Sequence, residues 1–150
     1  MVIYLSQHGK ALSREENINR PLSPKGVRDC ESVAKFLKNK GFIINKIFHS
    51  GKLRSEESAR IFSTILSNGD IVERAGLKPN DAAKDFCDDL CEDSLYIGHL
   101  PQLEKVLSLL LLNDDSLNIV KFKNSGVICL EKIDDVYSIK WYVSPNLLEV

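Results

Sequence analysis

The sequence lacks both a long apolar run and an excess of either charge. Its longest uninterrupted apolar run, Met1 to Leu5, is far too short to cross a bilayer, and no basic segment followed by the roughly 7–15 apolar residues of a secretory signal opens the chain. Lys and Arg number 20 against 21 Asp and Glu, so no overall positive field can recruit nucleic acid or an anionic membrane. We therefore expect a cytoplasmic protein with neither of these as a partner.

Cysteine is sparse, and several phosphate-handling motifs are missing. The four cysteines, Cys30, Cys87, Cys91 and Cys129, contain no Cys-x-x-Cys pair, so a zinc site is not expected, and Cys30 and Cys129 fall on apolar positions of a helix and a strand. No arginine lies six positions after a cysteine, and Asp-x-Asp, Gly-x-Gly-x-x-Gly and Gly-x4-Gly-Lys-[Ser/Thr] are all absent. We expect no metal and no cofactor.

Strand-like and helix-like segments alternate along the chain, which indicates an α/β fold. A length of 150 residues fits one domain, 1–150. The predicted strands are Val2–Ser6, Ile44–Phe48, Ile71–Val72, Leu95–Gly98, Val127–Leu130 and Val136–Val143. The predicted helices run from Ser23–Pro24 to Gly41, over Leu53–Leu66 before the stop signal Asn68–Gly69, within Leu77–Glu92, and from Pro101 along Leu103, Val106, Leu107, Leu110 and Leu111.

The predicted architecture is a three-layer α/β/α sandwich. Its sheet is mostly parallel, and the last two strands form an antiparallel hairpin at the C-terminal edge, joined by residues 131–135. A long polar loop, Gly9 to Pro21, follows the first strand, and long loops in compact domains are often functional.

Three polar segments follow three of the predicted strands. His8, Arg54 and His99 each lie just beyond a strand, where ligands bind in open α/β sheets. Two imidazoles and one guanidinium suit a phosphoryl group, which needs a nucleophile and positive donors around its oxygens. Taken singly, each has a simpler interpretation: His8 as a structural hydrogen-bonding group, Arg54 as a solvated helix residue and His99 as a helix cap. The three together favour a phosphate site.

The same segments resemble the histidine phosphatase superfamily, in particular its short SixA-like phosphohistidine phosphatases. The resemblance spans the chain and rests on Gln7-His8-Gly9, Arg20–Gly26, Ser50–Ala59, Tyr96–Pro101, Ser125–Glu131, Trp141 and Pro145–Leu148. It implies a metal-independent phosphatase in which His8 is transiently phosphorylated and Arg54 and His99 bind the phosphoryl oxygens. By the same resemblance, Gln7, Gly9 and Arg20 would contact the phosphate.

Gln7 departs from the family, which has Arg-His-Gly at this position. Glutamine can donate hydrogen bonds to a phosphoryl oxygen, but it has no charge and cannot form the bidentate fork of arginine. Loss of one such donor can cost about 10²–10³ in rate. The alternative hypothesis is therefore a weakened or inactive module that binds phosphate or a phosphoprotein. A generic α/β interaction domain would require three coincident matches.

The general acid has no motif of its own. Asp81, with Asp85 as second choice, lies in the region where many histidine phosphatases place a carboxylate, although either residue could be a helix cap or a solvated side chain. A phosphohistidine substrate needs the acid less, because its leaving imidazole has a pKa of about 6.5. The short polar loops leave little material for a lid, which favours a phosphoprotein over a small phosphorylated substrate. We expect a monomer, and we assign no role to His49.

Overall fold

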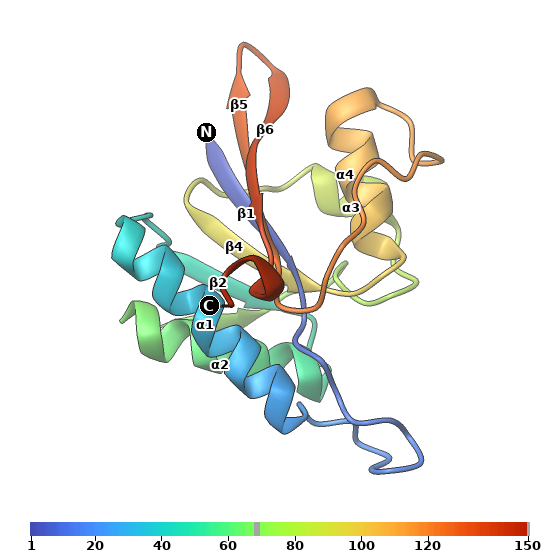
Figure 1. The fold of residues 1–150 in the computed structure, drawn as a ribbon. Helices are drawn as coiled ribbons and strands as arrows, with labels where there is room; N and C mark the ends of the chain where they lie inside the picture. The colour runs from blue at the N-terminus through green and yellow to red at the C-terminus, as the bar shows by residue number, and fades with distance from the viewer. Residues whose placement is uncertain (68–69, 150) are drawn as a thin grey trace.

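A six-stranded mixed sheet forms the centre of the computed structural model, which describes residues 1–67 and 70–149 (Figure 1). The strands are β1 Val2–Gln7, β2 Lys46–His49, β3 Ile71–Glu73, β4 Ser94–Gly98, β5 Val127–Ile133 and β6 Val136–Val143. They follow the order β3-β2-β4-β1-β5-β6, with β3, β2, β4 and β1 parallel and with β5 and β6 antiparallel to their neighbours. This arrangement confirms the mostly parallel sheet with an antiparallel edge hairpin.

Helices cover both faces of the sheet (Figure 1). The helical segments are α1 Pro24–Lys40, α2 Leu53–Leu66, α3 Ala83–Cys87, α4 Gln102–Leu112 and the 3-10 turn η1 Pro145–Leu147. Tyr4 packs with α1 and α2, whereas Ile3 and Leu5 pack with α3 and α4, because successive side chains of a strand point to opposite faces. The three-layer sandwich is confirmed.

The first helix begins and ends where its sequence predicts. Ser23 accepts the backbone N–H of Gly26 at 3.0 Å, and Pro24 occupies the first helical position. Gly41 ends the helix with a φ of 77°, a left-handed conformation that glycine adopts at little cost. The second helix also ends at Leu66 as predicted, although the stop signal Asn68–Gly69 lies outside the described residues.

The helix predicted within Leu77–Glu92 is much shorter in the structure. Only Ala83–Cys87 is helical, because a turn precedes it in which a carboxylate oxygen of Asp81 accepts the backbone N–H of Lys78 at 3.0 Å. Ala83 and Phe86 are its buried side chains, and so short an apolar face cannot extend a helix through the surrounding aspartates.

Two other predicted strand boundaries are wrong by two residues or more. The second strand starts at Lys46 rather than Ile44, because Asn45 donates its backbone N–H to Asp93 in the loop before β4. The link between β5 and β6 is two residues long, not five: Asp134 and Asp135 have φ values of 50° and 64°. Two successive positive φ angles are typical of the tight turn that matches the twist of a hairpin.

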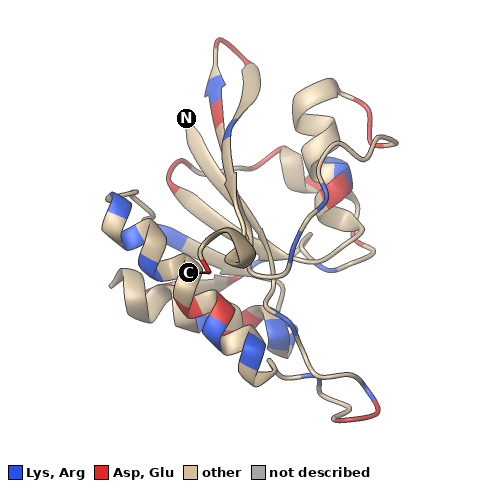
Figure 2. Cartoon of the chain, in the orientation of Figure 1, with Lys and Arg blue, Asp and Glu red and all other residues tan. Residues whose placement is uncertain are grey.

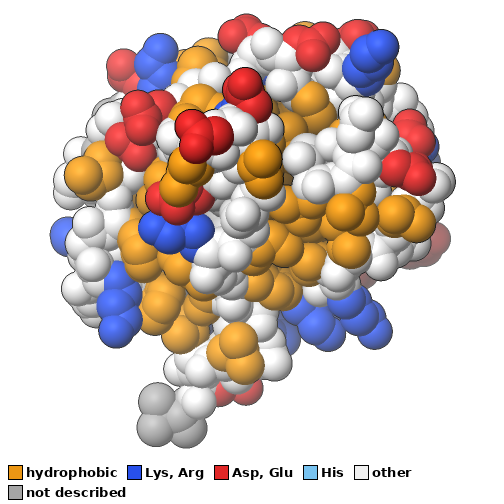
Figure 3. Space-filling model, turned by 90° about the horizontal axis from the view of Figure 1, so that it is seen from above, with side chains coloured by type: hydrophobic (Ala, Val, Ile, Leu, Met, Phe, Trp, Pro, Cys, Tyr) orange, Lys and Arg blue, Asp and Glu red, His pale blue; other side chains and the backbone are white. Residues whose placement is uncertain are grey.

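The cysteines and the absence of a long apolar run can also be compared with the structure. Cys30 and Cys129 are buried, as their apolar positions predict. Ile133, Val136 and Ile139 of the hairpin are exposed, and the view from above shows apolar side chains gathered between charged ones on this face (Figure 3). Within residues 1–67 and 70–149, no helix is long and apolar enough to span a membrane.

Candidate active site

His8 lies directly after β1 and is 8% exposed. Its Nδ1 atom is 2.6 Å from the carbonyl oxygen of Gly9, and a carbonyl can only accept, so Nδ1 carries the proton. The Nε atom of Arg54 donates to Nε2 of His8 at 3.3 Å, and an arginine can only donate. Both contacts require the same neutral tautomer, which leaves the lone pair of His8 on Nε2.

His99 lies directly after β4 and is 1% exposed. Its ring centroid is 4.9 Å from that of His8. Its Nε2 atom is 2.6 Å from the Oγ atom of Ser50, whereas its buried Nδ1 atom has no hydrogen-bond partner among the residues described. The second imidazole therefore faces the first with one nitrogen held in place and the other unpaired.

Burial and positive neighbours keep both imidazoles uncharged. Desolvation is the main cause that lowers the pKa of His8 to about 4, aided by the charges of Arg54 and Arg20 and opposed by the hydrogen bond to Gly9. Desolvation, followed by the charges of His8 and Arg54, lowers the pKa of His99 to about 3. At neutral pH both rings are neutral.

Arg54 extends from the first turn of α2. Burial lowers its pKa, and so do the charges of Arg20 and Arg14, so several cations gather around His8. Ser55 fixes the start of the helix, because its Oγ atom donates to the carbonyl of Ile97 in β4 at 2.8 Å and accepts the N–H of Ser50 at 3.1 Å. These two bonds join the start of α2 to the ends of β2 and β4.

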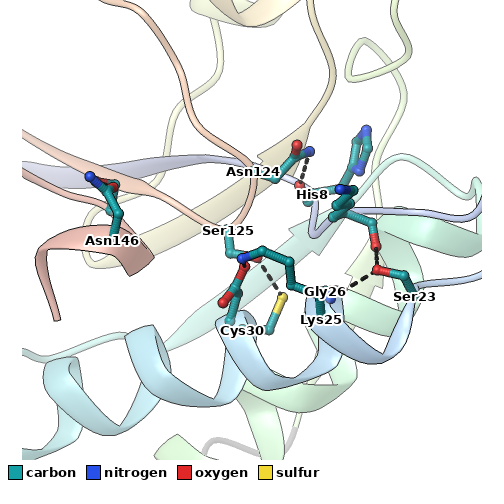
Figure 4. A network of polar contacts seen from close by, with 11 residues as sticks. His8, Ser23, Lys25, Gly26, Cys30, Asn124, Ser125 and Asn146 are labelled. Atoms are coloured by element: carbon teal, nitrogen blue, oxygen red, sulfur yellow. Dashed lines mark hydrogen bonds and ion pairs between the residues drawn. The ribbon is translucent and has the colours of Figure 1, made fainter. Parts of the chain in front are cut away.

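Three polar residues outside the predicted site hold this arrangement. Ser58 accepts the N–H of Gly9 at 2.9 Å and donates to the carbonyl of Arg54 at 2.7 Å, and Ser50 binds His99. Asn124 donates from Nδ2 to the carbonyl of His8 at 3.0 Å (Figure 4). The two serines lie within the segment Ser50–Ala59, but a polar residue just before β5 was the only sequence signal for Asn124.

Gln7, Gly9 and Arg20 were the predicted phosphate contacts, and each has a defined place in the structure. Gln7 is half-buried at the end of β1, in register with Gly98 of β4. The N–H of Gly9 is taken by Ser58, so Gly9 orients His8 through its carbonyl. Arg20 donates from Nε to the carbonyl of Leu12 at 3.0 Å, and its charge reaches both histidines.

A cavity of about 730 Å³ has Ser50, the hydrogen-bond partner of His99, in its wall, but neither His8 nor His99 lines it. Asp81 and Asp85 both line it, so the two candidate general acids share one space, which Ser50 connects to His99. His49 does not line this cavity, and its Nδ1 atom accepts the N–H of Gly51 at 3.1 Å. In the part of the chain that the structure describes, no three His, Cys, Asp or Glu side chains are grouped to hold a metal ion.

Comparison with known proteins shows a shared fold. No protein-family model matches the sequence, and no curated protein matches it. The protein histidine phosphatase SixA complexed with tungstate has a TM-score of 0.88 at 21% identity, over 99% of this chain and 100% of that one. The putative phosphohistidine phosphatase SixA from Agrobacterium tumefaciens has a TM-score of 0.78 at 20% identity, over 96% of this chain and 97% of the other.

Phosphatases with other names share the fold at lower identity. A putative alpha-ribazole-5'-P phosphatase from Escherichia coli has a TM-score of 0.75 at 12% identity, over 97% of this chain and 98% of the other. A phosphoserine phosphatase from Entamoeba histolytica in complex with 3-phosphoglyceric acid has a TM-score of 0.70 at 15% identity, over 95% of this chain and 96% of the other. The predicted likeness to histidine phosphatases is therefore confirmed for the fold.

Proposed function

We propose that this protein is a phosphatase that transfers a phosphoryl group to His8 and then to water, with phosphohistidine on a protein as its substrate. The observation that carries the proposal is the neutral His8 ring, which presents the lone pair of Nε2 beside Arg54 and His99. A deprotonated nitrogen within a group of positive donors is what a phosphoryl acceptor requires.

In the first step, the lone pair of His8 Nε2 forms a bond to phosphorus. The bond from phosphorus to the substrate imidazole breaks, and the departing nitrogen takes a proton from solvent. In the second step, water attacks phosphorus, the bond to Nε2 breaks and inorganic phosphate leaves. Arg54 donates to the phosphoryl oxygens in place of Nε2, and the unpaired Nδ1 of His99 is available to them.

Phosphohistidine fits the site better than an alkyl phosphate. The leaving imidazole has a reference pKa of about 6.5 and departs without a strong acid, whereas an alkoxide requires one. The hydrogen bonds that hold His8, Arg54 and His99 involve no carboxylate. Asp81 and Asp85 line only the neighbouring cavity.

Phosphoryl trapping tests the proposal. After incubation with a phosphohistidine protein, the chain should carry a phosphoryl group that survives base and is lost in acid, because protonation of its nitrogen releases a phosphoramidate. Peptide mapping should place the group on His8 rather than on His49 or His99. The variant His8→Ala should show neither label nor turnover, and full turnover by this variant would refute the proposed nucleophile.

Gln7 supports a second candidate function, a module that binds phosphate without turnover. It stands at the end of β1, one residue before His8, and brings no charge to the site. Under this alternative, phosphate or vanadate should raise the thermal stability of the protein while no label appears on His8.

A further inference from the structure

A second cleft has in its wall Asn124, which is hydrogen-bonded to the backbone of His8. Its volume is about 300 Å³. It is formed by four segments that are distant in sequence, which are the loop after β1, the start of α1, the loop before β5 and the C-terminal turn η1 (Figure 4). Its lining residues are Lys10, Lys25, Asp29, Lys123, Asn124, Pro145, Asn146 and Glu149.

The walls of this cleft are tied to the backbone of His8. Asn124, a lining residue, donates to the carbonyl of His8 at 3.0 Å, and the N–H of Ser125 donates to the carbonyls of Gln7 and His8 at 3.0 and 3.3 Å. The Oγ atom of Ser125 is also 3.2 Å from the buried sulfur of Cys30 in α1 (Figure 4). The loop before β5 therefore belongs both to the cleft and to the support of the nucleophile.

Lys10 is fixed at the other wall by the start of α1. Its carbonyl oxygen accepts the N–H of Ser23 at 2.8 Å and the Oγ–H of Ser23 at 2.9 Å. Gly26 permits this approach, because a Cβ atom at that position would lie 2.1 Å from the same oxygen. The backbone of Lys10 is thus held two residues from His8, while its side chain is exposed.

The charges of the cleft are unevenly compensated. Both carboxylates act on Lys25: Asp29 pairs with it at 2.8 Å, and the hydrogen bond and charge of Asp29, then the charge of Glu149, raise the pKa of Lys25. Lys10 acts electrostatically on Glu16, but neither Lys10 nor Lys123 forms an ion pair with any residue in 1–67 or 70–149. The cleft therefore presents two lysines without an ion-pair partner beside the amide of Asn124.

This positive charge exceeds what a phosphoryl group uses. Arg14, Arg20 and Lys52 act electrostatically on Arg54 or on His99, so their charge is available to a phosphoryl group bound at His8. Lys10 and Lys123 line the separate cleft instead. Basic residues, with acidic ones among them, lie at the lower side of the molecule, where the carboxyl ends of the parallel strands lie (Figure 2).

We propose that this cleft binds acidic side chains of the polypeptide that carries the phosphoryl group. That the bound polypeptide carries a phosphoryl group rests on the proposed function. That an acidic polypeptide binds is inferred from the residues of the cleft alone. Lys10 and Lys123 meet the carboxylates, and the side-chain amide of Asn146, whose oxygen already accepts from Ser144, has its N–H groups left to donate.

Binding is tested with a fluorescein-labelled peptide of alternating glutamate and alanine that contains no phosphoryl group. The double variant Lys10→Glu/Lys123→Glu should weaken its binding by about tenfold or more, because two attractive charges become repulsive. The matched control Lys105→Glu/Lys121→Glu makes the same change of net charge at exposed lysines that do not line the cleft. Equal weakening in both variants, or none in the first, would overturn the proposal.

Two further readouts locate the binding and identify its partner class. In nuclear magnetic resonance spectra, the peptide should shift the side-chain amide signals of Asn124 and Asn146, and unmoved signals would place it elsewhere. Single-stranded DNA of equal charge should bind more weakly than the peptide. Equal or tighter binding of the DNA would make the cleft a general polyanion site and would refute recognition of a polypeptide.

Kinetics separate this proposal from the proposed function. For a phosphohistidine protein, the variant Lys10→Glu/Lys123→Glu should raise KM about tenfold with little change in kcat, whereas KM for an aryl phosphate should stay within about twofold. Turnover with an unchanged KM for the protein would leave the phosphatase standing and remove the docking cleft. If neither substrate is turned over, the peptide titration still decides the cleft.

Discussion

The Oγ atom of Ser58 accepts the backbone N–H of Gly9 at 2.9 Å, across 49 residues of sequence. The same oxygen donates to the carbonyl of Arg54 at 2.7 Å. One side chain thus links the residue that orients His8 to the residue that donates to its Nε2. The spacing between nucleophile and arginine depends on this hydroxyl.

The first prediction concerns Ser58→Ala. The variant leaves the buried N–H of Gly9 without its partner, so the free energy of unfolding should fall by about 1–3 kcal/mol, as measured by urea denaturation. Its phosphatase rate should fall as well, because His8 loses its alignment with Arg54. Thr64→Ala is the matched control, since Thr64 makes the same kind of bond, to Arg60, on the exposed side of α2. An equally large loss of stability and rate in Thr64→Ala would show that the Ser58 hydroxyl acts only by stabilising the helix.

The second prediction is a pH dependence of stability. The folded-state pKa values of His8 and His99, about 4 and about 3, lie below the unfolded value of 6.5. The unfolded chain therefore binds more protons than the folded one below pH 6.5. The contribution to stability is complete above that pH and is lost progressively as pH falls from 6.5 to the folded-state values of about 4 and about 3. Each histidine should contribute a slope of about 1.4 kcal/mol per pH unit within this window.

Urea denaturation at several pH values, compared between the native sequence and His99→Gln, isolates the contribution of His99 from that of the carboxylates. The variant should show the shallower slope between pH 6 and pH 4.5. In parallel, the ring resonances of His8 and His99 should not titrate between pH 8 and pH 5. A midpoint near 6.5 for either ring would contradict the neutral pair.

The third prediction concerns Gln7→Arg. If the site is catalytic, the added guanidinium should raise the phosphatase rate by about tenfold or more, because it places charge near the transferred phosphoryl group. If the protein only binds phosphate, the same change should strengthen phosphate or vanadate binding in a thermal-shift titration without creating turnover. No effect in either measurement would mean that residue 7 does not face the phosphate.

The fourth prediction separates the two candidate acids. Asp81→Asn should lower kcat for an alkyl phosphate by about 10² or more, because the alkoxide leaving group needs a proton. For phosphohistidine it should change kcat little. Asp85→Asn, which alters a carboxylate in the wall of the same cavity, is the control. If Asp85→Asn alone slows the alkyl phosphate, the acid is Asp85 and our first choice is wrong.

The sequence was sufficient to predict the elements whose signals are local. The cap at Ser23, the stop at Gly41 and the alternation of β6 each depend on a few neighbouring residues. The helix and the strand lie where these signals predict them. The helix expected after a polar entry loop within Leu77–Glu92 formed only over Ala83–Cys87, because its apolar positions were too few to extend it beyond the turn around Asp81. Short weak periodicity does not decide between a turn and a helix.

The same distinction holds for the site. His8, Arg54 and His99 could be brought together from sequence, because residues that follow neighbouring parallel strands meet at one edge of the sheet. Asn124 could not, since its bond to His8 depends on β5 running antiparallel beside β1. Ser58 could be located on α2, but its hydrogen bond to Gly9 could not be predicted, because it depends on the conformation of the loop after β1.

The bond from Asn124 to the carbonyl of His8 spans 116 residues. It forms only when β1 has taken its place between β4 and β5, so nearly the whole chain must have reached its final order before His8 is held. Contacts of such long sequence separation close late during folding, because the loop entropy is lost before the contact compensates for it. Recovery of function after dilution from denaturant would therefore mark the end of refolding, while helical structure returns earlier.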